Sequence, residues 1–294
     1  MTEKSTRQIE RALGDWTRAR LPHALAEFVM FVLKLGWASL FGGLLLIGLI
    51  ASKMLWSEAM PIARYDALFV YAVSLQFLFL WFRLESLDEA RVIVLFHVTG
   101  TAMEVFKVQA GSWAYPEPGL VKLANVPLFS GFMYASVGSF MARAIRLFEM
   151  RFDPYPPYWT TILLACAIYV NFFAQHFLPD ARPILFAATA ILFFKTRVKF
   201  HIGDNDYWMP MVMAAVLTSF FLWVAENIGT RTNTWIYPGQ GAFDWVSLSK
   251  MGSWYLLIYV SFATVTLVFR QALGPANEPA LQTARPDQIG DERR

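Results

Sequence analysis

Two motifs that lie 122 residues apart, from Glu104 to Glu226, share a glutamate near their start that is followed by the same aromatic residues. The first reads MEVFKVQAGSWAYPEPG and the second AENIGTRTNTWIYPGQG. The shared residues are Glu104, Trp113, Tyr115, Pro116 and Gly119 in the first motif, and Glu226, Trp235, Tyr237, Pro238 and Gly241 in the second. Because Trp and Pro are uncommon residues, their recurrence in register predicts an internal repeat.

The two glutamates are the first candidates for chemistry. A carboxylate near the end of an apolar segment is costly to place at membrane depth, so such a residue points to a function. Two carboxylates that face one cavity can share a proton and act as an acid/base couple or a proton carrier. His97 lies seven residues before Glu104, on the same helix face, and is a third catalytic candidate.

The aromatic residues of the motifs allow a second interpretation of the glutamates. Each Glu can accept hydrogen bonds from the Trp and Tyr that follow it, and so only hold the loop against the helix end. Interfacial Trp and Tyr are also ordinary membrane anchors. Under the functional interpretation Trp113, Tyr115, Trp235 and Tyr237 contact a substrate, and His176, in a separate polar cluster, is a further candidate contact.

Several kinds of site are excluded by what the chain lacks. It has no Gly-rich phosphate loop, no Walker motif, no HExxH and no Ser/His/Asp signature. The single Cys166 and the four His show no ligand spacing, so neither a metal nor another cofactor is predicted. The formal net charge of +3 gives no indication of a nucleic-acid partner.

The elements that must hold these residues are apolar. Hydrophobic residues make up 56% of the 294 residues and charged residues only 16%, whereas soluble domains carry about 25% charged residues. Apolar runs long enough to span a membrane recur along the chain. The predicted helices are 27–51, 65–82, 90–109, 126–147, 158–178, 183–199, 208–228 and 247–269. The predicted fold is therefore an all-α, polytopic transmembrane bundle of about eight helices.

The repeat and the charges predict how this bundle is organised. Four helices return the chain to its starting side, so the repeat predicts two parallel four-helix units. Of the 25 Lys and Arg residues, 17 fall on one side if both termini are cytoplasmic, and only 7 on the other. The predicted parts are a cytoplasmic segment 1–26, a first repeat 27–147, a second repeat 148–270 and a disordered cytoplasmic tail 271–294.

Longer stretches of the chain resemble one bacterial family. They are HVTGTAMEVFKVQAGSWAYPEPG, then NVPLFSGFMYASVGSF, and NFFAQHFLPDAR. In these stretches the chain resembles the YoaT-type family of bacterial integral membrane proteins (domain-of-unknown-function family 817), over residues 27 to 270. This resemblance implies a multi-pass protein of the bacterial inner membrane and brings no established activity with it.

A weaker resemblance concerns a shorter pattern. A Glu on a helix, a loop with Gly, Trp and Tyr, and then Val-Pro-Leu opening the next helix is similar to carotenoid 1,2-hydratases and to heterodimeric lycopene cyclases. Carried over, it implies that Glu104 protonates an isoprenoid double bond beside Trp113 and Tyr115. Beyond Glu104, Gly111, Tyr115 and Pro127 the chain departs from the pattern, and the second carboxylate of the cyclases has no counterpart.

Three functions remain open from the sequence. The first is an intramembrane acid/base enzyme acting on an apolar isoprenoid or lipid. The second is a proton-coupled small-molecule transporter or channel, and the third is a structural membrane protein without turnover. In all three the lipid bilayer is a partner, and the oligomeric state is left open.

Overall fold

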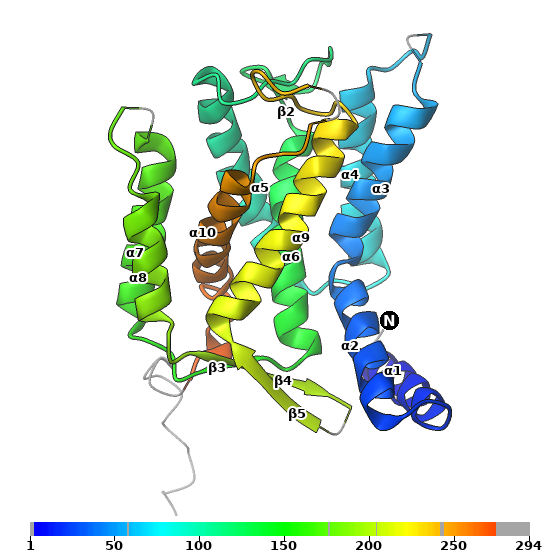
Figure 1. The fold of residues 1–294 in the computed structure, drawn as a ribbon. Helices are drawn as coiled ribbons and strands as arrows, with labels where there is room; N and C mark the ends of the chain where they lie inside the picture. The colour runs from blue at the N-terminus through cyan, green and yellow to red at the C-terminus, as the bar shows by residue number, and fades with distance from the viewer. Residues whose placement is uncertain (1–2, 58, 176, 204, 242–243, 275–294) are drawn as a thin grey trace, which may run out of the picture.

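The computed structural model describes residues 3–57, 59–175, 177–203, 205–241 and 244–274, which are mostly helical (Figure 1). The α-helices are α1 (Glu3–Arg18), α2 (His23–Ala38), α3 (Leu40–Leu55), α4 (Arg64–Trp81), α5 (Leu87–Gln109), α6 (Phe129–Leu147), α7 (Tyr158–Ala174), α8 (Arg182–Leu192), α9 (Met211–Arg231) and α10 (Leu248–Val265). The strands are β1 (Lys122–Leu123), β2 (Val126–Pro127), β3 (Arg151–Asp153), β4 (Arg197–Ile202) and β5 (Asn205–Pro210), and a short 3-10 helix, η1, covers Arg270–Ala272.

The helices follow the apolar runs of the sequence, with two corrections. The run 27–51 is not one straight span, because α2 and α3 meet at Ser39 with a bend of 68°. The run 183–199 is shorter than predicted: α8 ends at Leu192, and β4 begins at Arg197. In β4 buried Val198, Phe200 and Ile202 alternate with more exposed polar residues, and this period of two is typical of a strand.

Membrane crossing is supported by length and composition for part of the bundle. Within the described residues, three helices are long and apolar enough to cross a membrane: α5, α9 and the stretch Leu248–Val268 that contains α10. The bent pair α2 and α3 counts as a fourth if it is one span. Large apolar side chains such as Val94, Val98 and Ile191 are exposed on the outer helix faces, as expected of surfaces that contact lipid.

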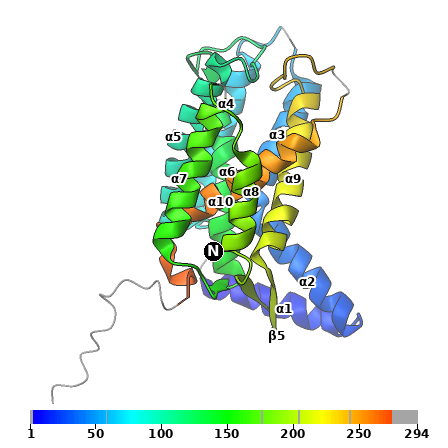
Figure 2. The same cartoon turned by 60° about the vertical axis from the view of Figure 1, so that its left-hand side comes forward.

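The two ends of the bundle differ. The loops after α5 and α9, with the small β1–β2 pair, lie at one end, which we call the loop end (Figure 1). The antiparallel sheet β3–β4–β5 lies at the other, the sheet end. Helix α1 lies across the sheet end in both views of the molecule (Figure 1, Figure 2).

Helix α5, whose last turns carry Glu104 of the first motif, packs along α6. A capping box starts α5, in which Ser86 Oγ accepts from the Glu89 amide and the Glu89 carboxylate accepts from the Ser86 amide. Buried Glu89 also pairs with Arg146 of α6, at 2.9 Å. Glu85, just before α5, pairs with the fully buried Arg143 at 3.0 Å. These paired charges fix α5 against α6 at the sheet end.

The end of the described chain is packed. Gly274 donates its amide to the carbonyl of Phe152 in β3, and Leu273 is buried beside it. Residues 271–274, which the sequence analysis assigns to a disordered tail, therefore lie against the sheet end. The remainder of that predicted tail, 275–294, is outside the described residues.

Candidate functional site

The carboxylate of Glu104, near the end of α5, accepts three hydrogen bonds. Its Oε2 accepts from Trp113 Nε1 at 2.7 Å and from the Tyr115 hydroxyl at 2.8 Å. Its Oε1 accepts from the Tyr134 hydroxyl of α6 at 2.6 Å. Glu104 is buried, with 3% of its surface exposed, so these three donors take the place of water around the carboxylate.

Glu226, near the end of α9, has an equivalent set of partners. Its Oε1 accepts from Trp235 Nε1 at 2.9 Å and from the Tyr237 hydroxyl. Its Oε2 accepts from Trp254 Nε1 of α10 at 3.1 Å. The loop-to-helix hydrogen bonds expected from the Trp and Tyr of each motif are therefore present in both.

The two motif loops also pair with each other. Ala114 and Ile236, which occupy the same position in the two motifs, exchange both backbone hydrogen bonds, at 3.0 and 2.9 Å. The rings of Trp113 and Tyr237 lie edge to face with centroids 6.0 Å apart. Because equivalent residues pair with each other, Glu104 and Glu226 lie on opposite sides of this contact between the two loops.

Two glycines make room for aromatic hydrogen-bond donors. A Cβ on Gly100 of α5 would lie 2.6 Å from the Cβ of Tyr134, so only glycine lets Tyr134 approach Glu104 along this face. A Cβ on Gly229 of α9 would overlap the indole of Trp235. Both rings thus depend on close approach to helix backbone.

Two charged residues of α4 hold the loops in place. Buried Arg64 donates to the Thr232 carbonyl at 3.1 Å and to the Thr234 hydroxyl at 2.9 Å, and also pairs with Glu117. Asp66 accepts from the backbone amides of Leu120 and Val121. One helix therefore positions segments of both motif loops.

The tyrosines of the motif loops are held in their protonated form. Burial, together with the negative charge of Glu104, raises the pKa of Tyr115 well above its usual value near 10. Burial and the charge of Glu226 raise the pKa of Tyr237 in the same direction. Both hydroxyls therefore remain hydrogen-bond donors to their glutamates.

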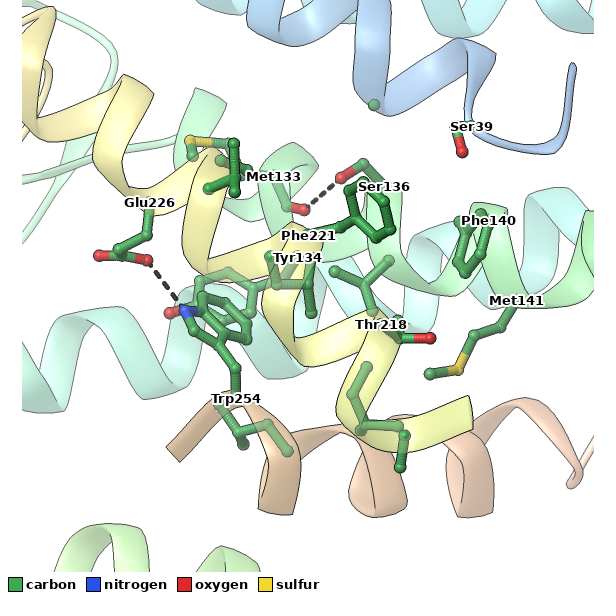
Figure 3. A pocket seen from close by; sticks show the side chains of 18 of the residues that line it. Ser39, Met133, Tyr134, Ser136, Phe140, Met141, Thr218, Phe221, Glu226 and Trp254 are labelled. Carbon is green, nitrogen blue, oxygen red and sulfur yellow. Dashed lines mark hydrogen bonds between the residues drawn. The ribbon is translucent and has the colours of Figure 1, made fainter. Parts of the chain in front are cut away.

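Both glutamates line a single large cavity, with a volume of about 1190 Å³. Its wall is mostly aliphatic and aromatic, and it is built from α2, α3, α5, α6, α9 and α10. Figure 3 shows Tyr134, Trp254 and Glu226 grouped together, with Phe221, Thr218, Phe140 and Met141 farther along the same space. The lining reaches from Arg182 at the loop end to Val198 and Phe200 at the sheet end.

The donors differ between the two glutamates in a way that affects protonation. Among the described residues, Glu104 Oε1 accepts a hydrogen bond only from the Tyr134 hydroxyl, which can accept a hydrogen bond as well as donate one. Each oxygen of Glu226 faces an indole N–H, which can only donate. A proton fits on Glu104 Oε1, whereas a proton on either oxygen of Glu226 would crowd an indole N–H.

The histidine candidates are placed differently from the glutamates. His97 packs against Phe132, with ring centroids 4.5 Å apart, and is absent from the described residues that line the cavity. The structure therefore does not bring His97 together with Glu104 and Glu226. His176 lies outside the described residues. In the described ranges of the chain, no group of three His, Cys, Asp or Glu side chains is placed to hold a metal ion.

Three residues of the site escaped the sequence analysis. Tyr134 and Trp254 each supply the third donor to a glutamate, and Lys250 lines the cavity beside them. Tyr134 and Trp254 are not separated by the repeat offset, so the motif comparison could not reveal them. The sequence signal that could have pointed to them is a Tyr or Trp, each with one hydrogen-bond donor, on the helix that follows each motif.

Comparison with known proteins identifies the family. The model of the family described as "Protein of unknown function (DUF817)" matches residues 27–262. The chain belongs to this family. The family resemblance stated from the sequence is thereby confirmed.

A relative of this DUF817 chain is the "Uncharacterized protein YoaT" of Bacillus subtilis (strain 168). It is 39% identical over 243 residues, which cover 82% of this chain and 91% of the relative. The similarity thus extends over nearly all of the helical bundle. Neither the description of the family nor the name of this relative mentions a hydratase or cyclase, so the second resemblance stays a hypothesis.

Two solved structures are similar to this DUF817 chain. One is a cross-linked trimer of MvINS, with 13% identity, a TM-score of 0.46, and coverage of 63% of this chain and 95% of that chain. The other is MvINS itself, described as a mycobacterial Insig homolog from Mycobacterium vanbaalenii. It has 12% identity, a TM-score of 0.43, and coverage of 63% and 97%.

Proposed function

We propose that this protein is an intramembrane acid/base enzyme that acts on an apolar lipid or isoprenoid, with Glu104 as the group that exchanges a proton with the substrate. The observation that carries the proposal is that Glu104 and Glu226 both line a large cavity whose wall is otherwise mostly apolar. Keeping two carboxyl groups inside such a cavity is costly, and groups retained at such a cost point to binding or catalysis.

The hydrogen-bond partners support different roles for the two glutamates. Glu104 can hold a proton on Oε1, next to Tyr134, and both residues line the cavity. Glu226, with an indole N–H on each oxygen, remains a fixed carboxylate. A pair of carboxyl groups whose surroundings favour opposite protonation states is a familiar arrangement for acid/base chemistry.

The chemistry that suits this arrangement is protonation of a carbon–carbon double bond. Transfer of the Glu104 proton to an alkene carbon would leave a carbocation, which the faces of neighbouring aromatic rings can stabilise. Loss of a proton from an adjacent carbon to Glu104 would restore the acid and release a neutral product. Trp113, Tyr134 and Trp254 line the cavity beside the glutamates and are the rings in position to contact the cation.

The membrane arrangement belongs to the same proposal. The eight apolar helical segments would form two parallel four-helix repeats in the bacterial inner membrane, with both termini cytoplasmic. The reciprocal backbone pair of Ala114 and Ile236 supports the repeat, because equivalent residues meet there. The bias of Lys and Arg toward one side supports the orientation.

Transport is the second candidate, and one feature favours it. The cavity lining extends from Arg182 at the loop end to Phe200 at the sheet end, as an alternating-access path for an apolar solute would require. The apolar wall between these ends supports a lipid-like solute over an ion.

The test compares hydrophobic extracts of four bacterial strains by mass spectrometry. The strains lack the gene or carry it as wild type, as Glu104→Gln, or as Glu149→Gln, an isosteric change at an exposed site. We expect a lipid or isoprenoid species that appears with wild type and Glu149→Gln and is absent from the other two. Identical extracts from all four strains would refute the enzyme and leave uptake into proteoliposomes as the test of transport.

A further inference from the structure

Three basic side chains line the loop end of the cavity. They come from three helices: Lys107 from α5, Arg182 from the start of α8 and Lys250 from the start of α10. Their charges lie close enough to act on one another. The loop end of the cavity therefore holds three cations beside the carboxyl groups of Glu104, Glu226 and Asp180, while the rest of its wall is mostly apolar.

Lys250 has no hydrogen-bond acceptor or carboxylate partner among the described residues. Its ammonium lies 4.0 Å from the centroid of the Tyr237 ring and 5.3 Å from that of the Trp113 ring. These rings hold the charge in place but leave its three N–H donors unused. Helix α10 begins two residues earlier without a side-chain cap, so its N-terminal amides add positive potential at the same place.

The carboxylates near Lys250 are occupied by other donors. Glu104 and Glu226 each accept three hydrogen bonds from aromatic side chains, and Asp180 accepts from Arg182 at 2.6 Å. Glu104 and Glu226 do act on Lys250 through space. The negative charge near Lys250 disfavours a ligand that carries two negative charges. The arrangement therefore fits a head group with a single negative charge.

The remainder of the cavity offers space for a long hydrocarbon chain. Its volume of about 1190 Å³ exceeds the range of roughly 300–1,000 Å³ that small-molecule pockets occupy. Apolar side chains such as Phe140, Phe221 and Leu257 continue the lining away from the cationic end. The site is thus charged at one end and apolar along its length.

We propose that this cavity binds an amphiphile that has one long apolar chain and a head group with a single negative charge, such as a carboxylate, held by Lys250. The proposal rests on the function proposed above, since it names the class of substrate for the same cavity. Head-group capture by Lys250 would place the chain beside Glu104 and the aromatic rings.

The test uses the full chain in nanodiscs of phosphatidylcholine. Two probes are compared, a palmitate with a photoreactive diazirine in its tail and the alcohol of the same chain, and labelled residues are identified by mass spectrometry. We expect the acid to label cavity residues more strongly than the alcohol does. In Lys250→Met the labelling by the acid should fall about tenfold or more, the scale of a lost hydrogen bond to a charged group, while the alcohol is unaffected.

Control variants separate the head-group contact from misfolding. Lys250→Arg keeps the charge and should keep the labelling, and Lys199→Met removes a distant lysine that pairs with Asp153 and should change nothing. Inorganic phosphate should not displace the acid, because it has no tail. Equal labelling by acid and alcohol, unchanged labelling in Lys250→Met, or displacement by inorganic phosphate would each overturn the proposal.

The experiments distinguish a failure of this proposal from a failure of the proposed function. Selective binding of the acid without any change in lipid extracts would refute the proposed enzyme activity and leave the proposed binding of an anionic amphiphile unaffected. A changed lipid in the extracts together with equal labelling by acid and alcohol would support the enzyme activity and refute the binding of an anionic head group by Lys250. Glu104→Gln should retain labelling by the acid, because it leaves Lys250 in place.

Discussion

Replacing each glutamate by glutamine should destabilise the protein at one site much more than at the other. In Glu104→Gln the new amide can take the place of Oε1, where the Tyr134 hydroxyl can turn to accept from it. In Glu226→Gln the amide must face an indole N–H, from Trp235 on one side or Trp254 on the other. Two donors then point at each other in a buried site.

The size of this difference follows from the cost of an unsatisfied buried donor, about 1–3 kcal/mol. Both variants also lose the extra strength of hydrogen bonds to a charged acceptor, and that loss is common to the two because each glutamate has three donors. Glu226→Gln should therefore lower the free energy of unfolding by roughly 2 kcal/mol more than Glu104→Gln does.

The assay is unfolding in mixed micelles of increasing SDS fraction, followed by circular dichroism so that the fluorescence of the site's own tryptophans does not bias the result. Wild type and both variants are measured in the same detergent at the same pH. Equal losses in the two variants would refute the assignment of donors, as would a larger loss for Glu104→Gln. The second result would place the proton-bearing carboxyl at Glu226 instead.

Two further predictions concern packing and pH. Gly229→Ala should lower the free energy of unfolding by about 1–3 kcal/mol, because its Cβ would overlap the Trp235 ring. In Gly43→Ala the added Cβ would meet no atom of a neighbouring element within 4 Å, so this change should stabilise its helix by up to about 1 kcal/mol. Both variants are measured by SDS unfolding. A loss of stability in Gly43→Ala or a gain in Gly229→Ala would contradict the packing described. The hydrogen bond to Asp206 raises the pKa of His201 above 6.5, so the pair should stabilise the hairpin fully below that pH and lose this contribution as the pH rises through the raised value. Unfolding measured between about pH 6 and 8 should show this loss in wild type and not in His201→Gln, and parallel curves would exclude the pair as its source.

Much of the bundle follows directly from the chain's apolar runs. Each predicted run overlaps a helix, because burial of some twenty consecutive apolar residues leaves the backbone few options other than a helix. The run at 183–199 was predicted too long because the apolar residues Phe193, Phe194 and Val198 continue it beyond the end of α8 at Leu192. Val198, Phe200 and Ile202 alternate with Arg197, Lys199 and His201, a strand pattern that is present in the sequence itself but begins inside the predicted helical run.

At the site, too, some contacts could be predicted from the sequence and others could not. Recurrence of Glu, Trp and Tyr in register was enough to predict the hydrogen bonds from each loop to its own glutamate. The sequence also placed His97 on the face of Glu104, but neighbouring positions on one helix do not decide which of them meets a cavity. His97 instead packs on Phe132.

The sequence by itself determined the membrane-embedded class, the positions of the helices and the paired Glu, Trp and Tyr, because these depend on composition and on spacing within one segment. Only the tertiary structure decided that the two motif loops pair, that Tyr134 and Trp254 complete the two carboxylate sites, and that Lys250 stands at the end of an apolar cavity. Those contacts join residues from different helices. Such contacts depend on how close the helix axes come, which is set by glycines such as Gly100 and by buried charge pairs such as Glu85 with Arg143.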